Sequence, residues 1–414
     1  MQLRTALAAA VVVVALAGTA VFGFSAVADS GGTLSERWVS NTTSATQSNH
    51  HAPAVGRVGG SSLVFAPVSG EFETDQCALV AQNASDGSSR WQEPIPSANC
   101  TIHAVADPTL ADFVGDDTKE VIATSTEQEV AAYRPRTGEQ VFQYDLTDYG
   151  YTQPVVADLT GDGGNELVVV DVQGTVFVLR PNGTAVWTET LSSYTWGQPA
   201  VEDFDADSQR EVVVGTSSGQ LVLFDHKGTK AWNRTRPFES SITWMTTGQA
   251  DDDRATEIVT ATVDGRVTAI DGERGAVQWQ RDFGEFAAVH TLRDGDGDGD
   301  PEVYAVAKDG KIRSLNASDG STEWTTTLTT ESVQMMPPPV MGDVDTDTDP
   351  ELVAATNDGI VSVVDPRSGD VLASYERGVP IYVHPTVADT DGDGTAEVYA
   401  IYGDGRVVAL SYTE

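Results

Sequence analysis

A nine-residue acidic segment of the chain reads Asp294-Gly295-Asp296-Gly297-Asp298-Gly299-Asp300-Pro301-Glu302, and a short apolar stretch follows it directly. Seven copies of such a segment end in a glutamate, and the successive glutamates lie 46, 45, 46, 45, 49 and 46 residues apart. A nearly fixed period of this length indicates an array of repeated supersecondary units. The closing glutamates are Glu120, Glu166, Glu211, Glu257, Glu302, Glu351 and Glu397.

One repeat can be followed in full between residues 154 and 191. It contains four short runs rich in β-branched and apolar residues; the acidic segment separates the first two, and glycine-containing turns separate the others. Asp-Gly at the matching turn of other repeats is a strong β-hairpin signal, because both residues tolerate positive φ. Each unit is therefore predicted to be a four-stranded antiparallel blade of an all-β propeller. The expected strands of this repeat are 154–158, 166–171, 175–180 and 184–191.

The number of repeats predicts eight blades. Seven contain the acidic segment, and a degenerate first unit over residues 51–100 carries Cys77 and Cys100 in its place. The last unit stops after its third strand, so we expect residues 35–40 to close the ring and remove an unpaired sheet edge. A seven-bladed ring is the alternative if residues 51–100 stand apart. The expected blades, which follow a linker over 29–50 and fill a propeller over 51–414, are 51–100, 101–147, 148–192, 193–238, 239–284, 285–330, 331–377 and 378–414.

A second repeated mark is Gly-x-x-x-Trp, whose tryptophan falls in the expected fourth strand. The segment Leu315-Asn-Ala-Ser-Asp319-Gly320-Ser-Thr-Glu-Trp324 resembles the tryptophan-docking repeat of PQQ-like (quinoprotein-type) propellers, which implies eight blades that pack through these tryptophans. Quinoprotein dehydrogenases typically carry an adjacent cysteine pair near the cofactor, which Cys77 and Cys100 cannot supply, so PQQ binding is not expected. The pairs are Gly87/Trp91, Gly183/Trp187, Gly228/Trp232, Gly275/Trp279 and Gly320/Trp324, and Phe142 replaces the tryptophan after Gly138.

The acidic segments resemble the calcium loops of FG-GAP (integrin-like) repeats. Ca²⁺ takes about 6–8 oxygen ligands in flexible geometry, which alternating carboxylates, a backbone carbonyl and a closing glutamate can supply. We expect structural, weakly bound calcium at five loops, whereas Val114 and Gln249 interrupt the pattern in the other two. The expected ligands are Asp158, Thr160, Asp162 and Glu166; Asp203, Asp205, Asp207 and Glu211; Asp294, Asp296, Asp298, Asp300 and Glu302; Asp343, Asp345, Asp347, Asp349 and Glu351; and Asp389, Asp391, Asp393 and Glu397.

The segments that lead into the first strand of each blade are rich in aromatic and amide side chains, and we call them the lead-in segments. Residues two apart on a strand face the same side, so these side chains could line a funnel on the face opposite to the acidic loops. Such a funnel suits a sugar, a peptide or a planar ligand; the alternative is that they fill the narrow centre of the ring. The six histidines are scattered, and only His290 and His384 fall in these segments as we read them. The ligand-face candidates are Tyr151, Gln153, Trp196, Gln198, Trp244, His290, Tyr382 and His384.

Charge and the N-terminal residues bear on location. The formal net charge of -38, from 62 acidic and 24 basic residues, disfavours nucleic acid as a partner and is typical of a halophilic protein. Residues 1–28 have the form of a signal peptide, with Ala26-Val27-Ala28 as a cleavage site, or of an N-terminal membrane anchor if they are retained. In an exported chain Cys77 and Cys100 are expected to form a disulfide. We therefore expect an extracellular or cell-surface protein.

The sequence contains no recognisable catalytic motif. It has no nucleophile elbow, no His-x-x-x-His pair and no glycine-rich phosphate loop. The first hypothesis is a monomeric, calcium-stabilised, non-catalytic scaffold that binds a protein or glycan at the cell surface, as in adhesion. The alternatives are a PQQ-dependent or carbohydrate-active enzyme that uses the aromatic face, and an envelope assembly factor, as some PQQ-like propellers are.

Overall fold

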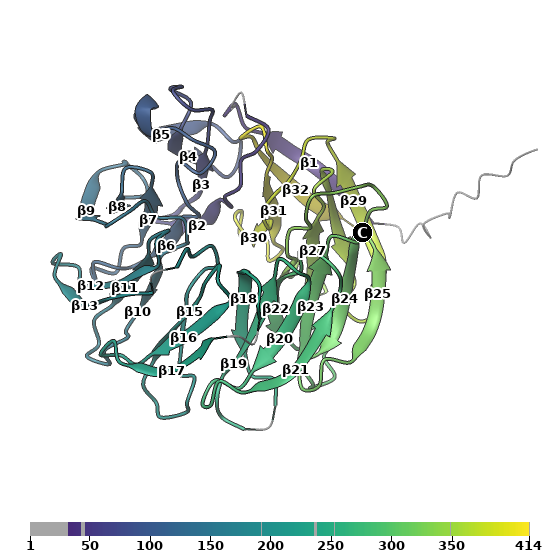
Figure 1. The fold of residues 1–414 in the computed structure, drawn as a ribbon. Helices are drawn as coiled ribbons and strands as arrows, with labels where there is room; N and C mark the ends of the chain where they lie inside the picture. The colour runs from purple at the N-terminus through teal and green to yellow at the C-terminus, as the bar shows by residue number, and fades with distance from the viewer. Residues whose placement is uncertain are drawn as a thin grey trace, which may run out of the picture.

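Eight antiparallel sheets of four strands form a ring (Figure 1). The structure is a computed structural model that describes residues 32–42, 46–191, 193–235, 238–251, 253–347 and 349–413. The expected signal peptide or anchor, residues 1–28, lies outside them. The predicted eight-bladed all-β propeller is confirmed, and we number the blades 1 to 8 in chain order. Among the described residues, no helix has the length and apolar character needed to cross a membrane.

In blades 1 to 7 the chain runs outwards, from an inner strand to an outer strand at the rim. Blades 1 to 4 contain β2 (Ala54–Val58), β3 (Ser61–Val68), β4 (Ala78–Asn83), β5 (Ser89–Pro94); β6 (Thr109–Ala111), β7 (Glu120–Ser125), β8 (Glu129–Tyr133), β9 (Gln140–Asp145); β10 (Val155–Ala157), β11 (Glu166–Val170), β12 (Thr175–Leu179), β13 (Ala185–Thr190); and β14 (Ala200–Glu202), β15 (Glu211–Gly215), β16 (Gln220–Phe224), β17 (Lys230–Thr235).

Blades 5 to 8 repeat this plan, and a 3-10 turn over Ser97–Asn99 follows blade 1. Their strands are β18 (Ile242–Gly248), β19 (Glu257–Thr262), β20 (Arg266–Ile270), β21 (Val277–Asp282); β22 (Ala288–Arg293), β23 (Glu302–Ala307), β24 (Lys311–Asn316), β25 (Thr322–Thr327); β26 (Val340–Gly342), β27 (Glu351–Ala355), β28 (Ile360–Val364), β29 (Val371–Glu376); and β30 (Thr386–Ala388), β31 (Glu397–Ile401), β32 (Val407–Thr413), β1 (Thr33–Val39).

Strand β1 supplies the outer strand of blade 8, which is the place that the sequence predicts for it. It pairs antiparallel with β32, and its register shifts between Glu36 and Trp38. Leu34 and Trp38 are buried, so the strand is joined to the ring by apolar packing as well as by its ladder. The first and last blades therefore meet without an open sheet edge between them.

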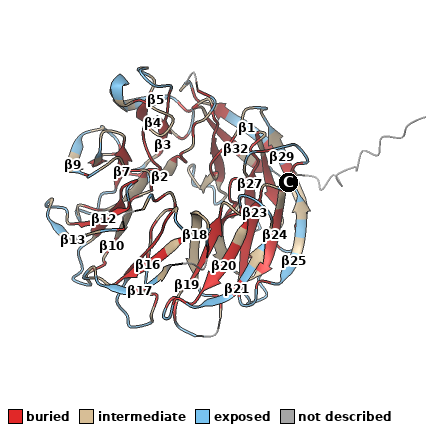
Figure 2. Cartoon of the chain, viewed as in Figure 1, coloured by how far each residue is buried: buried red, intermediate tan, exposed pale blue. Residues whose placement is uncertain are grey.

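Burial explains why the strands differ in composition. Every residue of the second strand β11 is buried, whereas in the outer strand β13 exposed and half-buried residues mix. Figure 2 shows the same change from buried strands inside the ring to exposed strands at the rim. The apolar clusters extend from one blade to the next, as where Leu223 of blade 4 packs with Trp232 and with Ile258 of blade 5. Each blade thus buries its faces against its neighbours.

The repeated tryptophans join neighbouring blades. Trp279 of blade 5 donates its indole Nε1–H to the carbonyl of Ala317 in blade 6 at 2.6 Å, and its ring covers Gly320. Gly320 has φ +70°, and a Cβ there would lie 2.5 Å from the indole, so a glycine is required on both counts. The same bond runs from Trp38 to Ala84, Trp91 to Pro135, Trp187 to His226, Trp232 to Gly272 and Trp324 to Pro366.

Blade 1 corrects one detail of the sequence interpretation. The turn between its first two strands is short and contains Gly59 and Gly60 with positive φ, so this turn takes the place of the acidic loop. The predicted disulfide between Cys77 and Cys100 is confirmed. It joins the connection before β4 to the segment after β5. Both lie at the end of the blade opposite to the turn between β2 and β3. The cysteines therefore fasten the funnel side of blade 1 and do not replace a metal loop.

Candidate functional site

The lead-in segments surround a cavity of about 410 Å³ at one end of the ring axis. Five of the eight ligand-face candidates line it, together with Met335 and Met336. Their rings are in contact around the wall: Tyr151 lies edge-on to Trp196 at 5.0 Å between centroids, and Tyr194 stacks on Trp196 at 5.9 Å. We call this cavity the funnel. The five candidates are Tyr151, Trp196, Gln198, Trp244 and Tyr382.

Sequence reasoning missed three histidines and an aspartate in this wall: His50, His51, His103 and Asp107. The ring of His103 lies 5.0 Å from those of His50 and Tyr151 and 5.7 Å from that of His51. The interpretation of the histidines as scattered is therefore wrong, because His103 lies with His50 and His51 in the structure although it is far from them in the sequence. A signal was present, because Asp107 stands five residues before Asp112, the first acid of its loop, and Gln198 stands five before Asp203.

Asp107 connects four lead-in segments. It is 5% exposed. One carboxylate oxygen accepts hydrogen bonds from His51 Nδ1 at 2.8 Å and from the Ala52 amide at 3.1 Å, and the other accepts from Gln198 Nε2 at 3.2 Å. His384 Nε2 lies 3.9 Å from the second oxygen. Asp107, the one carboxylate among the described residues of the funnel wall, is therefore engaged by groups of blades 1, 4 and 8.

Two imidazoles in the wall, those of His50 and His103, are neutral near pH 7. Burial, with the neighbouring His51, lowers the pKa of His50 to about 4 and that of His103 to about 3. Among the described residues, His51 Nε2 and the Nδ1 atoms of His50 and His103 have no hydrogen-bond partner.

Three candidates lie elsewhere than the funnel wall. His290 and His384 face a second cavity along the inner strands of blades 5 to 8, with ring centroids 4.4 Å apart. Burial lowers the pKa of His290 to about 3. Gln153 donates to the carbonyl of Pro108 at 3.1 Å and so joins blades 2 and 3.

Ser241 lines the funnel, but no hydrogen bond links it to His51 among the described residues, so the His51–Asp107 pair lacks a hydroxyl within hydrogen-bond reach.

The acidic loops lie at the opposite ends of the inner strands, because each joins the end of a first strand to the start of a second. The closing glutamate is buried in all seven and accepts a hydrogen bond from the backbone amide seven residues earlier, as Glu302 does from Gly295 at 2.9 Å. This bond fixes the loop to the start of the second strand. The other amides are those of Phe113, Leu159, Phe204, Ala250, Val344 and Thr390.

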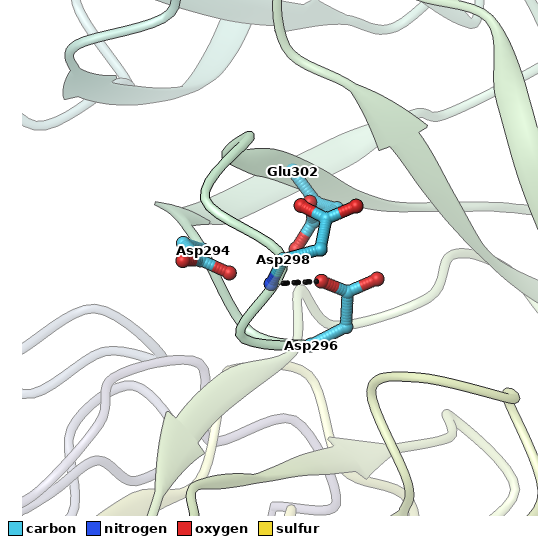
Figure 3. Close-up of side chains that lie close together, drawn as sticks. All are labelled: Asp294, Asp296, Asp298 and Glu302. Atoms are coloured by element: carbon cyan, nitrogen blue, oxygen red, sulfur yellow. Dashed lines mark hydrogen bonds between the residues drawn. The ribbon is translucent and has the colours of Figure 1, made fainter.

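Carboxylate oxygens gather in five of the loops. In each group, one ligand atom per residue lies within 4.8 Å of the others, and the blade 6 group has four members (Figure 3). Burial, opposed by the backbone hydrogen bond and reinforced by nearby carboxylates, raises the pKa of Glu211, Glu257, Glu302 and Glu351 to about 7. The groups are Asp203, Asp205 and Glu211; Asp251, Asp253 and Glu257; Asp294, Asp296, Asp298 and Glu302; Asp343, Asp345 and Glu351; and Asp389, Asp391 and Asp393.

These groups differ most from the expected ligand sets in blades 3 and 5. The blade 5 group, which Gln249 was expected to disrupt, is gathered, and the amide of Gln249 points at loop carbonyls instead. Asp158, Thr160, Asp162 and Glu166 of blade 3 are not among the gathered groups of the described residues. Expected ligands outside the gathered groups are Asp207, Asp300, Asp347, Asp349 and Glu397.

Comparison with known proteins agrees with this architecture. Residues 5–160, 126–301 and 254–414 match the family described as outer membrane protein assembly factor BamB. The crystal structure of BamB from Moraxella catarrhalis is similar, with a TM-score of 0.62 and 15% identity over 92% of this chain and 98% of that chain. The computationally designed Ika8 protein gives 0.64 and 15% over 91% and 99%, and BBS1N in complex with ARL6DN gives 0.54 and 14% over 73% and 91%.

At these identities the solved structures show the fold alone, and no match was found among curated proteins. The match to the family model shows more than the fold, because its three segments together span nearly the whole chain. Its repeat also agrees with the tryptophan docking and the eight blades described above. This chain therefore belongs to the PQQ-like repeat family described as outer membrane protein assembly factor BamB.

Proposed function

We propose that this protein is an exported, non-catalytic scaffold of the cell envelope that binds an extended, aromatic-rich segment of another polypeptide in the funnel. The observation that carries the proposal is the chemistry of the wall, where aromatic rings alternate with neutral imidazoles and an amide. Aromatic walls with a few convergent polar groups are typical of ligand sites. The disulfide supports export, because such bonds persist in oxidising compartments. The family description supports a role in assembly.

Charge favours an uncharged polypeptide segment over an anionic ligand. The funnel wall holds no basic side chain among its described residues, and its one carboxylate is already hydrogen-bonded three times. An acidic or phosphorylated ligand would find no counter-charge there.

The test is binding to an array of overlapping peptides cut from exported proteins of the same organism. The wild-type protein should bind peptides rich in aromatic residues, and the double variant Tyr151→Ala/Trp196→Ala should lose this binding. Phe72→Ala is the control, because Phe72 is 64% exposed and does not line the funnel. Equal binding by the double variant and the wild type, or a preference for charged peptides, would refute the proposal.

The alternatives give different results on the same protein. Adhesion through sugars would appear as selective binding to a glycan array that Tyr151→Ala/Trp196→Ala abolishes. A quinoprotein activity would require a bound chromophore and dye-linked alcohol oxidation after addition of micromolar PQQ. The second outcome is not expected, since the wall contains no lysine or arginine for the carboxylates of that cofactor among its described residues.

We also propose that the gathered acidic loops of blades 4 to 7 bind calcium, which stabilises the fold. The support is the convergence of three or four carboxylates, the hard oxygen ligands that Ca²⁺ prefers, in a loop fixed by its buried glutamate. An ion that binds the folded state alone stabilises it by mass action. Thermal unfolding at constant ionic strength tests this: the midpoint should rise with millimolar Ca²⁺ and fall with EDTA. An unchanged midpoint, together with no bound calcium in equilibrium dialysis, would contradict it.

A further inference from the structure

We infer that the ring has two kinds of acidic loop, one neutralised by an arginine of the chain and one that takes a divalent cation. The inference rests on the proposed calcium binding and states which blades need the ion. It starts from an observation that the sequence pattern alone does not show. A guanidinium, which is itself a cation, lies among the loop carboxylates in blades 2, 3 and 8.

Blade 2 shows the arrangement most clearly. Arg134 donates from Nη1 to the free oxygen of Glu120 at 2.6 Å, and its Nη2 lies 2.7 Å from an oxygen of Asp116. The side chain of Glu120 is fully buried, and its second oxygen accepts the amides of Phe113 and Val114. Both oxygens of the closing glutamate are thus satisfied without any ion. The guanidinium stands where a bound metal would otherwise neutralise the loop.

The other two arginines reach their loops differently. In blade 3, Arg180 lies 3.7 Å from Glu166 and 3.6 Å from Asp162, while Thr160 donates to the same oxygen of Glu166. In blade 8 the cation comes from strand β1, where Arg37 occupies the register shift and pairs with Glu397 and with Asp391 at 3.0 Å. Ring closure therefore also supplies the counter-charge of the last loop.

The contrast between blades lies at one structural position, the residue that begins the turn between the third and fourth strands. Arg180 of blade 3 and Asp225 of blade 4 begin turns of equal length, in which the amide of each bonds to a threonine carbonyl four residues on. Arg134 of blade 2 matches Asn316 of blade 6 in a turn one residue longer, because the amide of each bonds to a carbonyl five residues on. The position that carries a cation in blades 2 and 3 therefore carries an acid or an amide in blades 4 and 6.

No basic side chain approaches the gathered carboxylates of blades 4, 5 and 6 to within ion-pair distance among the described residues. In blade 5, Oε1 of Glu257 is buried and without a hydrogen-bond partner, and it belongs to the group with Asp251 and Asp253. A buried, unpaired carboxylate oxygen aimed at two other carboxylates is costly unless a cation joins them. These blades are the ones that take the ion. In blade 7, Arg367 pairs with Asp349, outside the gathered group.

Reciprocal substitutions in the full-length chain test the inference. Asn316→Arg gives blade 6 the residue that Arg134 provides in blade 2, and Arg180→Asp gives blade 3 the residue that blade 4 has. The number of calcium ions bound per chain is measured by equilibrium dialysis at saturating Ca²⁺, and circular dichroism checks folding. Asn316→Ala is the matched control, because it removes the same side chain without adding a charge.

We expect Asn316→Arg to bind one ion fewer than the wild type, Asn316→Ala to bind the wild-type number, and Arg180→Asp to bind one more. The inference is overturned if Asn316→Arg keeps the full number or if Arg180→Asp gains none while the wild type binds calcium. A wild-type chain that binds no calcium overturns the calcium proposal itself and this inference with it. If Asn316→Arg does not fold, Asp225→Arg in blade 4 gives the same loss of one ion as the deciding result.

Discussion

Replacement of Trp38 by alanine tests how the ring is closed. Trp38 is 8% exposed, donates its indole N–H to the carbonyl of Ala84 at 2.7 Å and covers Gly87 of blade 1. Truncation of a buried tryptophan to alanine costs about 3–5 kcal/mol, through lost apolar contact and the cavity left behind. The hydrogen bond adds about 1 kcal/mol, since the Ala84 carbonyl loses its partner. We therefore expect a loss of about 5 kcal/mol in the free energy of unfolding.

Trp279 is the matched control, because it makes the same contacts inside the ring, with 6% exposure and a bond to Ala317 at 2.6 Å. Trp279→Ala should cost a similar amount at equilibrium. Trp38→Ala should in addition let β1 detach locally from β32, since the indole joins this strand to Ala84 and Gly87 of blade 1.

Two measurements check this prediction. Urea unfolding gives the free energies, and limited proteolysis with mass spectrometry gives the rate of cleavage between β1 and β2 below the unfolding transition. Trp38→Ala should be cut faster than Trp279→Ala at equal global stability. The reasoning is refuted if Trp38→Ala costs less than about 1 kcal/mol, a value typical of surface changes, or if the two variants are cut at the same rate.

Three further predictions follow from the described contacts. Arg134→Met should lower the free energy of unfolding by about 2 kcal/mol, because it leaves the buried Glu120 oxygen without its charged partner; chemical denaturation measures this, and a loss near zero would show that the ion pair is dispensable. Cys77→Ser/Cys100→Ser should cost about 3 kcal/mol, since the bridge closes a loop with a sequence separation of 23; the reduced wild type should unfold at the same urea concentration as this variant. The pKa values of His50 and His103 are lowered in the folded state to about 4 and about 3, whereas a histidine of the unfolded chain has its ordinary pKa of about 6.5. Below about pH 6.5 the unfolded chain therefore binds more protons than the folded chain. Their contribution to stability is therefore complete above that pH and is lost as the pH falls towards 4, so His103→Gln should flatten the dependence of unfolding free energy on pH between these limits relative to wild type, and an unchanged slope would contradict the assignment.

Most of the fold could be predicted from the sequence because its determinants are local and repeated. The period of the acidic segments, the Asp-Gly turns and the alternating apolar runs each specify one blade, and eight copies specify the ring. Trp38 also indicated where the closing strand lies, because it supplies the tryptophan that blade 8 otherwise lacks. The disulfide between Cys77 and Cys100 was predictable for a different reason, as there are only two cysteines to pair.

The candidate site was predicted only in part. Tyr151, Trp196 and Gln198 were found because they recur at fixed distances before an acidic loop. His50 and His51 precede a blade that has no such loop, so no register marked them. His103 likewise falls outside the two repeated positions. The calcium ligands show the converse, because the spacing of Asp158, Asp162 and Glu166 is regular although the structure does not gather them.

The sequence by itself determined the repeat, its strands and turns, and the number of blades, because each depends on residues that are neighbours along the chain. Only the tertiary structure decided which lead-in segments meet at Asp107 and which acidic loops contain a guanidinium. Both depend on contacts across the ring or across a blade, as between His51 and Asp107 or between Arg37 and Glu397. A carboxylate's partner is set by distance in space, and the seven acidic segments, so alike in sequence, are neutralised in different ways because different residues face them.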